Sequence, residues 1–191
     1  VQSVLDTLAI LEKLGAEIVD VKMPNVSKTS EVSFEIETVE AVITHDKTFP
    51  MRADEYGRGF REGLEYGKAV TKVSYARALE FRENFSNQID TMLSTVDCLV
   101  CPTMSSAART KLVDPMRGSD ADWDNVVPND VFAAPFSMTG VPTLSVPSGF
   151  SSDGLPLSLQ FVGSRLNEEI ICRVGHAFEQ STIWHTKHPP V

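Results

Sequence analysis

The sequence is short of positive charge, and it has no long apolar run. Lysine and arginine number 17 against 26 aspartate and glutamate residues, which gives a formal net charge of -9. A surface of that sign disfavours nonspecific binding to nucleic acid or to anionic membranes, so neither is expected as a partner. Because the longest apolar stretches fall well short of a bilayer span, the sequence predicts no transmembrane helix.

Cysteine is also scarce: three residues at uneven spacing do not make a disulfide framework. This usage favours a reducing compartment, so a cytoplasmic location is expected. Cys98 and Cys101 form a C-x-x-C pair, but a zinc site needs further ligands, and Cys172 lies in a predicted helix. In a strand, residues three apart point to opposite faces, so the pair is interpreted as small core residues. No metal or cofactor is predicted.

No biased tract, internal repeat or linker divides the chain, and its 191 residues are expected to belong to one domain. Apolar residues recur at helical spacing before Gly15 and again from Ser30, the expected N-cap, to about His45. The longest predicted helix runs over residues 74–93. A strand is expected in residues 16–24, and helix–glycine–strand units of this kind are typical of α/β proteins.

A glycine-rich stretch lacks the spacing of a dinucleotide-binding loop. Its pattern is G-x-G-x-x-x-G, and no strand precedes it, so phosphate binding is not predicted. Loose turns around a short helix are expected instead. The glycines concerned are Gly57, Gly59, Gly63 and Gly67.

The run 148–154 superficially resembles a nucleophile loop because it is rich in serine and glycine. It lacks the second glycine of G-x-S-x-G, and a strand pattern follows it where that motif requires a helix. Asp153 and Gly154 instead predict a hairpin turn between the strands TLSVP and LPLSLQFVG. The second strand alternates, with Gln160 on the side opposite Phe161.

Two more helices are predicted in the final third. The first lies within residues 128–142, with Asn129 as a candidate cap and Pro135 in its interior. The second opens at Asn167, where two glutamates precede a clear apolar face.

The second half of the chain carries a distinctive order of motifs: VDCLVCPTM, then NDVFAAPFSMTGVPTLSVPSGF, then GLPLSLQFVGSRLNEEIICRVGHAFEQSTIWH. In this order the sequence resembles the C-terminal part of the amidase-signature family. That part of the family has a strand ending in Pro-Thr, a Gly-x-Pro segment, a strand ending in Pro-x-Gly-Phe, and Gly-Leu-Pro leading to Gln-x-x-Gly. The opening helix and LEKLGAEIVDVKMP resemble the family too, so the likeness covers nearly all of residues 1–191.

The resemblance implies an α/β fold with a mixed central β-sheet flanked by helices, of which residues 1–191 form the C-terminal part. Family members hydrolyse carboxylic amides through a serine nucleophile, a second serine in a cis peptide and a lysine base. The Gly/Ser-rich loop and its lysine are absent from this sequence, so no catalytic residue is assigned within it. We expect an amidase whose catalytic residues lie upstream, and a chain that is inactive alone. The expected partners are a small-molecule amide and the N-terminal half of the protein.

One binding residue transfers through the resemblance. In the glutamine-hydrolysing subunit of the tRNA-dependent amidotransferases, an aspartate ten residues before the glycine of Gly-x-Pro contacts the amide end of the substrate. Asp130 holds that position, ten residues before Gly140. Asp130 could equally flank the helix near Asn129. Gln160 and Asp153 also match the family pattern and are expected to be structural.

Two other functions stay open from the sequence. The chain could be a self-standing, non-catalytic domain that binds a small molecule or a protein, or a thiol or metal enzyme that uses Cys98 and Cys101. If it stands alone, its most apolar strands would have open edges or an uncovered face, and a homo-oligomer or aggregate is expected. Those strands lie around Leu99–Val100, Thr143–Pro147 and Leu157–Phe161.

Overall fold

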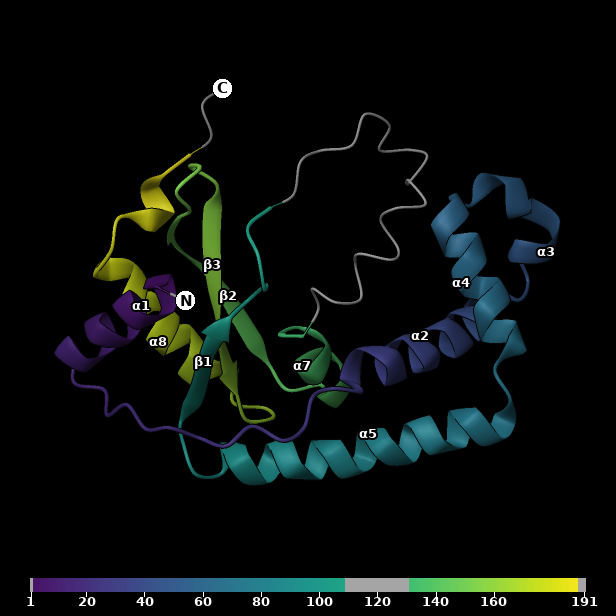
Figure 1. The fold of residues 1–191 in the computed structure, drawn as a ribbon, viewed down its shortest axis with the longest axis horizontal. Helices are drawn as coiled ribbons and strands as arrows, with labels where there is room; N and C mark the ends of the chain where they lie inside the picture. The colour runs from purple at the N-terminus through teal and green to yellow at the C-terminus, as the bar shows by residue number, and fades with distance from the viewer. Residues whose placement is uncertain (1, 109–130, 189–191) are drawn as a thin grey trace.

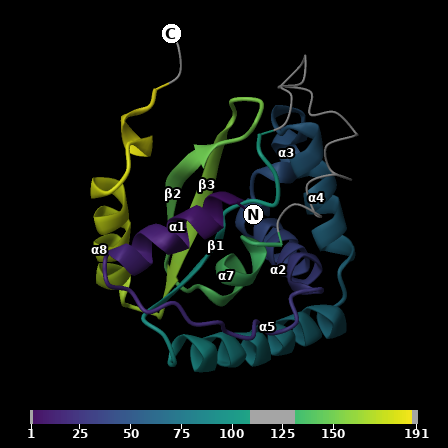
Figure 2. The same cartoon turned by 60° about the vertical axis from the view of Figure 1, so that its left-hand side comes forward.

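The computed structural model describes residues 2–108 and 131–188. Its elements, in chain order, are α1 (Gln2–Lys13), α2 (Thr29–His45), α3 (Phe49–Arg52), η1 (Ala53–Glu55), α4 (Arg58–Ala69), α5 (Lys72–Leu93), β1 (Cys98–Pro102), α7 (Ala134–Thr139), β2 (Thr143–Phe150), β3 (Pro156–Gly163), α8 (Glu168–Gln180) and η3 (Trp184–Thr186). Helices α1 and α8 lie on one side of the three strands and α7 on the other, while α2, α3 and α4 form an arm above α5 (Figures 1 and 2).

The three described strands form one sheet in the order β1-β3-β2, and both pairings are antiparallel. The predicted hairpin between β2 and β3 is confirmed. In its turn the Gly154 amide donates to the Ser151 carbonyl at 3.0 Å, and Gly154 has a φ of 77°, which glycine adopts without a steric cost. Because β3 is bonded on both sides, the open edges among the described strands belong to β1 and β2.

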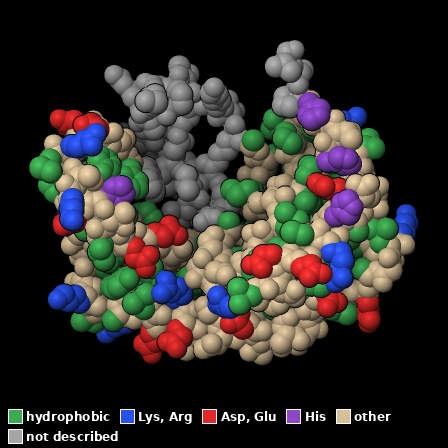
Figure 3. All heavy atoms as spheres, turned by 180° about the vertical axis from the view of Figure 1, so that it is seen from behind, with side chains coloured by type: hydrophobic (Ala, Val, Ile, Leu, Met, Phe, Trp, Pro, Cys, Tyr) green, Lys and Arg blue, Asp and Glu red, His purple; other side chains and the backbone are tan. Residues whose placement is uncertain are grey.

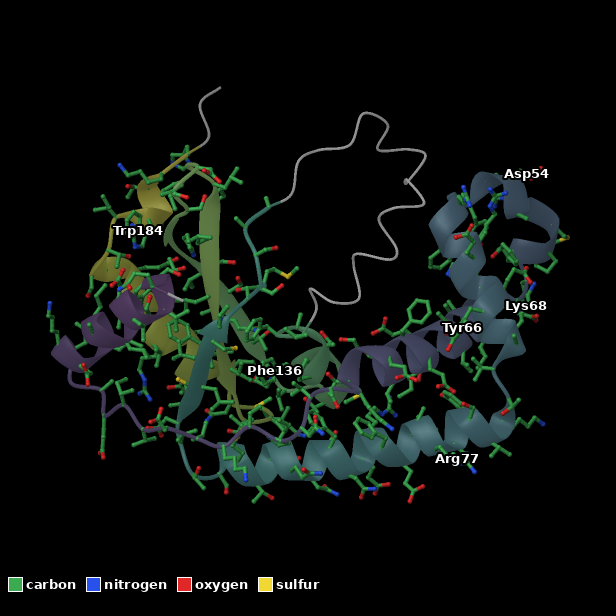
Figure 4. All side chains as sticks on the ribbon, viewed as in Figure 1. Asp54, Tyr66, Lys68, Arg77, Phe136 and Trp184 are labelled. Atoms are coloured by element: carbon green, nitrogen blue, oxygen red, sulfur yellow. The ribbon has the colours of Figure 1, made fainter. Side chains whose placement is uncertain are left out.

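Strand β3 separates two apolar clusters by its alternation. Leu159 and Phe161 are fully buried against α1 and α8, whereas Val162 is fully buried against α5 and α7. Full burial of such a side chain contributes about 1.5–3 kcal/mol. The labelled Phe136 lies between α7 and the sheet, in the cluster that contains Val162 (Figure 4). Gln160 shares the face of Val162 and therefore extends from the sheet toward α7.

The arm depends on close packing between α2 and α4. A Cβ on Gly67 would overlap the backbone carbonyl oxygen of Thr38 and lie 2.6 Å from the carbonyl carbon. Loose turns around a short helix were expected over residues 57–67: the helix is confirmed as α4, but it has 12 residues and includes Gly59, Gly63 and Gly67 where turns were expected. Lys68, from the last turn of α4, lies 4.6 Å from the centroid of the Phe49 ring, which joins α4 to α3 (Figure 4).

The strand expected in residues 16–24 is also wrong. The segment is extended but is not hydrogen bonded as a strand to any described strand, and its Ile18 and Val19 side chains are exposed. Val21 and Met23 instead pack against the apolar cluster that α5 and α7 form with Val162. The alternation of apolar residues thus reflects packing of a connecting segment and not sheet pairing.

Helix boundaries show smaller differences. Helix α2 begins at Thr29, so Ser30 is inside the helix and is not its N-cap. Helix α7 is confirmed, but Pro135 lies in its first turn, where the missing N–H costs no hydrogen bond. Asn129 lies outside the described residues. The predicted helices over 74–93 and after Asn167 are confirmed as α5 and α8. No described helix has the length and apolar character needed to cross a membrane.

Candidate functional site

The polar centre of the sheet is the side chain of Gln160, which is only 4% exposed. Its Nε2 donates to the carbonyl oxygen of Phe132 at 2.7 Å and to that of Pro102 at 3.2 Å. Carbonyl oxygens only accept, so the nitrogen of the amide, and not its oxygen, must face them. One amide group therefore joins the end of β1 to the residues that lead into α7.

We call the hydrogen bonds from Gln160 to Phe132 and Pro102 the tether. Two hydroxyl groups lie beside it. Thr103 Oγ1 and Ser145 Oγ are 2.9 Å apart, and they come from the segment after β1 and from β2. Ser145 is directly opposite Gln160 in the β2–β3 register, and its side chain is exposed. We call Thr103, Ser145, Gln160, Pro102 and Phe132 the Gln160 cluster. A hydroxyl both donates and accepts, so the exposed side of this cluster can hydrogen bond a polar ligand.

The thiol of Cys101 belongs to the wall of this cluster. Gln160 Nε2 is 3.4 Å from Cys101 Sγ. Burial raises the pKa of the Cys101 thiol to about 11, and the hydrogen bond from Gln160 offsets only part of that rise. Burial also raises the pKa of Cys98, helped by the nearby charge of Asp97. Both thiols therefore stay protonated near neutral pH, which is unfavourable for a nucleophile or a metal ligand.

The two cysteines of the C-x-x-C pair point to opposite faces of the sheet, as predicted. Cys98 packs toward α1 and α8, and Cys101 packs toward α5 and α7. In residues 2–108 and 131–188, no group of three or more His, Cys, Asp and Glu side chains is placed to hold a metal ion.

The serine-rich run 148–154 forms the end of β2 and the hairpin turn, which confirms the turn interpretation. Ser148 is 5% exposed, and its hydroxyl has no hydrogen-bond partner in the described part of the chain. A side chain buried to this extent is poorly placed to attack a substrate. His45 Nδ1 lies 2.9 Å from the Tyr56 hydroxyl in the helical arm. The other three histidines are exposed.

Of the residues that the sequence singled out for binding, Asp130 lies outside the described residues. Asp153 is exposed in the hairpin turn, where the sequence places it as a structural residue. Gln160 was expected to be structural, and its tether to Phe132 was not predicted. The partners are 28 and 58 residues away along the chain, so no local pattern signals the contact.

Charge is distributed without a single-sign patch on the face drawn in Figure 3, where acidic and basic side chains alternate over the surface. One exposed ion pair joins α5 to the turn after β3: Arg165 Nε lies 3.2 Å from both carboxylate oxygens of Asp90. Both side chains are more than 40% exposed, so this pair contributes little to stability.

Comparison with known proteins shows which family this sequence is similar to. The sequence model of the family named Amidase matches residues 1–172. The putative amidase AmiD of Mycobacterium tuberculosis is 35% identical over 153 residues, which cover 80% of this chain and 32% of that protein. A glutamyl-tRNA(Gln) amidotransferase subunit of Methanosarcina acetivorans is 29% identical over 215 aligned positions, covering 99% of this chain and 43% of that protein.

The fold agrees with these relatives. A solved crystal structure of an amidase superposes with a TM-score of 0.78 at 27% identity, and it covers 94% of this chain and 41% of the solved one. The likeness confirms the α/β fold expected from the sequence. The chain spans less than half the length of each of these proteins. Because the family model covers most of the sequence, this chain belongs to the Amidase family.

Proposed function

We propose that these residues are part of an amidase that hydrolyses the C–N bond of a small-molecule carboxylic amide. The observation that carries the proposal is the match to the Amidase family over residues 1–172. The 35% identity to a putative amidase and the superposition on a solved amidase support it. The same proposal places residues 1–191 and an N-terminal half in one domain of a cytoplasmic protein.

The chemical step proposed for the whole protein is acyl transfer to serine. A serine oxygen attacks the amide carbonyl carbon while its proton passes through a second serine to a neutral lysine. The C–N bond then breaks, and the amine leaves with that proton, returned through the second serine. Water then hydrolyses the acyl ester. The lysine must be neutral to accept the first proton, which burial favours by lowering its pKa. In this proposal the two serines and the lysine lie upstream of this chain.

The role proposed for this chain is to supply part of the substrate wall. The Gln160 cluster offers it hydroxyl groups at Thr103 and Ser145, which can hydrogen bond the polar groups of an amide. Asp130 is proposed to contact the amide end of the substrate. Phe132, two residues further along, is held by Gln160, which is consistent with a fixed position for this part of the wall.

The test compares the complete protein with the isolated chain of residues 1–191. Ammonia or amine release is measured over a panel of small carboxylic amides. We expect turnover by the complete protein and none by the isolated chain. Turnover by the isolated chain would show that the catalytic residues lie within it. A folded complete protein that binds small molecules but hydrolyses none of the amides would favour a non-catalytic binding domain.

A further inference from the structure

We propose that Gln160 is a positioning residue, which holds the residues leading into α7 against the end of β1 and so fixes the substrate wall. The inference rests on the proposed function for its kinetic consequence. Its structural basis is independent of that function. One buried amide group donates to two backbone carbonyls, at Phe132 and Pro102, that belong to separate segments.

The position of Gln160 itself is fixed by the sheet. Strand β3 is hydrogen bonded on both sides, and Gln160 is paired with Cys101 on β1 and with Ser145 on β2. Its neighbours Leu159 and Phe161 are fully buried on the opposite face. The backbone that carries Gln160 is therefore rigid, and the side chain transmits that rigidity to Phe132.

The tether adds a polar restraint to a part of the chain that apolar packing also holds, since Phe136 and Met138 of α7 are buried in the cluster that contains Val162. Helix α7 has only six residues, too few to be stable without tertiary contacts. Its N-cap, Ala133, makes no side-chain capping hydrogen bond. Among the described residues, the 2.7 Å bond from Gln160 to Phe132 is a side-chain hydrogen bond that links the lead-in to α7 with the sheet beside the Thr103–Ser145 hydroxyl pair.

This arrangement predicts a selective effect of removing the amide. Gln160→Met keeps the length of the side chain but removes both N–H donors, while the pairing of β3 and the apolar cluster around Leu159 remain. Gln160→Glu keeps the shape and exchanges the amide for a carboxyl group, which can donate one hydrogen only when it is protonated. Leu159→Val is the control, because it loosens the core one residue away without contacting Phe132.

The experiment uses the complete protein and two readouts. Hydrogen exchange of the peptide spanning residues 131–139 is expected to rise about tenfold in Gln160→Met, the scale of one lost buried hydrogen bond. KM for the amide substrate is expected to rise about tenfold with a smaller change in kcat. In Gln160→Glu, KM is expected to recover toward the native value as pH falls. Leu159→Val is expected to leave exchange in residues 131–139 and KM near their native values.

A hydrogen-exchange rate over residues 131–139 that stays at its native value in Gln160→Met would overturn the inference. An equal increase of that rate in Leu159→Val would overturn it too. A KM unchanged in Gln160→Met, in a protein that hydrolyses amides, would also overturn it. If the protein hydrolyses no amide, the proposed function fails, and hydrogen exchange alone then decides whether Gln160 holds the lead-in to α7.

Discussion

The contact between α2 and α4 at Gly67 allows a prediction that can be worked through from distances. In Gly67→Ala the added Cβ would overlap the carbonyl oxygen of Thr38, lie 2.6 Å from the carbonyl carbon and lie 3.0 Å from Val42 Cγ2. Backbone atoms cannot rotate away as a side chain can, so the two helices must separate. Gly63, one turn earlier on the same helix, has a different surrounding: its Cβ would lie 3.8 Å from Thr38 Cγ2, an ordinary contact.

The two substitutions share the same gain in helix propensity, about 1 kcal/mol for Gly→Ala in a helix interior. Overpacking of a tight contact typically costs ~1–3 kcal/mol. Gly63→Ala should therefore stabilise the protein by up to about 1 kcal/mol, and Gly67→Ala should destabilise it by up to about 2 kcal/mol. Because the gain in helix propensity is the same in both variants, the difference between their free energies of unfolding reports only the overlap of the Gly67→Ala methyl group with Thr38.

Urea unfolding of both variants, with the midpoint and the slope fitted separately, measures that difference. The variants should differ by about 1–3 kcal/mol in the free energy of unfolding, with Gly67→Ala the less stable. Equal stability of the two variants, or a more stable Gly67→Ala, would refute the close approach of α2 and α4.

Three further predictions concern the sheet and the proposed site. The raised pKa of Cys101 means that stability from its protonated thiol is complete below about pH 9 and is lost as pH rises toward 11, by no more than about 3 kcal/mol; urea unfolding at both pH values should show a smaller loss of stability in Cys101→Ala than in the native protein. Asp130→Asn should impair amide turnover by the complete protein while changing stability by about 1 kcal/mol or less; unchanged kinetics would leave Asp130 as a helix-flanking residue. The isolated chain of residues 1–191 should dimerise or aggregate through the open edges of β1 and β2, whereas light scattering from a stable monomer would favour a self-sufficient binding domain.

Elements whose signals are local in the sequence were predicted from it. The spacing of apolar residues identified α5 and α8, and the pair Asp153 and Gly154 identified the hairpin turn. Alternation along a strand also predicted that Cys98 and Cys101 face opposite clusters. Each of these features depends on neighbours within a few residues, which is the range over which periodicity and turn chemistry act.

Features that depend on distant partners could not be predicted in this way. The glycines of α4 have the composition of a turn, and only the position of Thr38 explains why Gly67 belongs in a helix. Residues 16–24 have the pattern of a strand, but strand formation also needs a neighbouring backbone to bond with. The role of Gln160 likewise depends on Phe132 and Pro102, which its own strand pattern does not specify.

The nucleophile of the proposed amidase is expected to lie outside residues 1–191, and the site of covalent labelling tests this most directly. The complete protein is treated with a serine-directed probe, and the labelled peptide is identified by mass spectrometry. We predict one stoichiometric label, on a serine outside residues 1–191. A label on any serine within residues 148–152 would contradict both the location of the nucleophile and the assignment of that run as a strand end and turn.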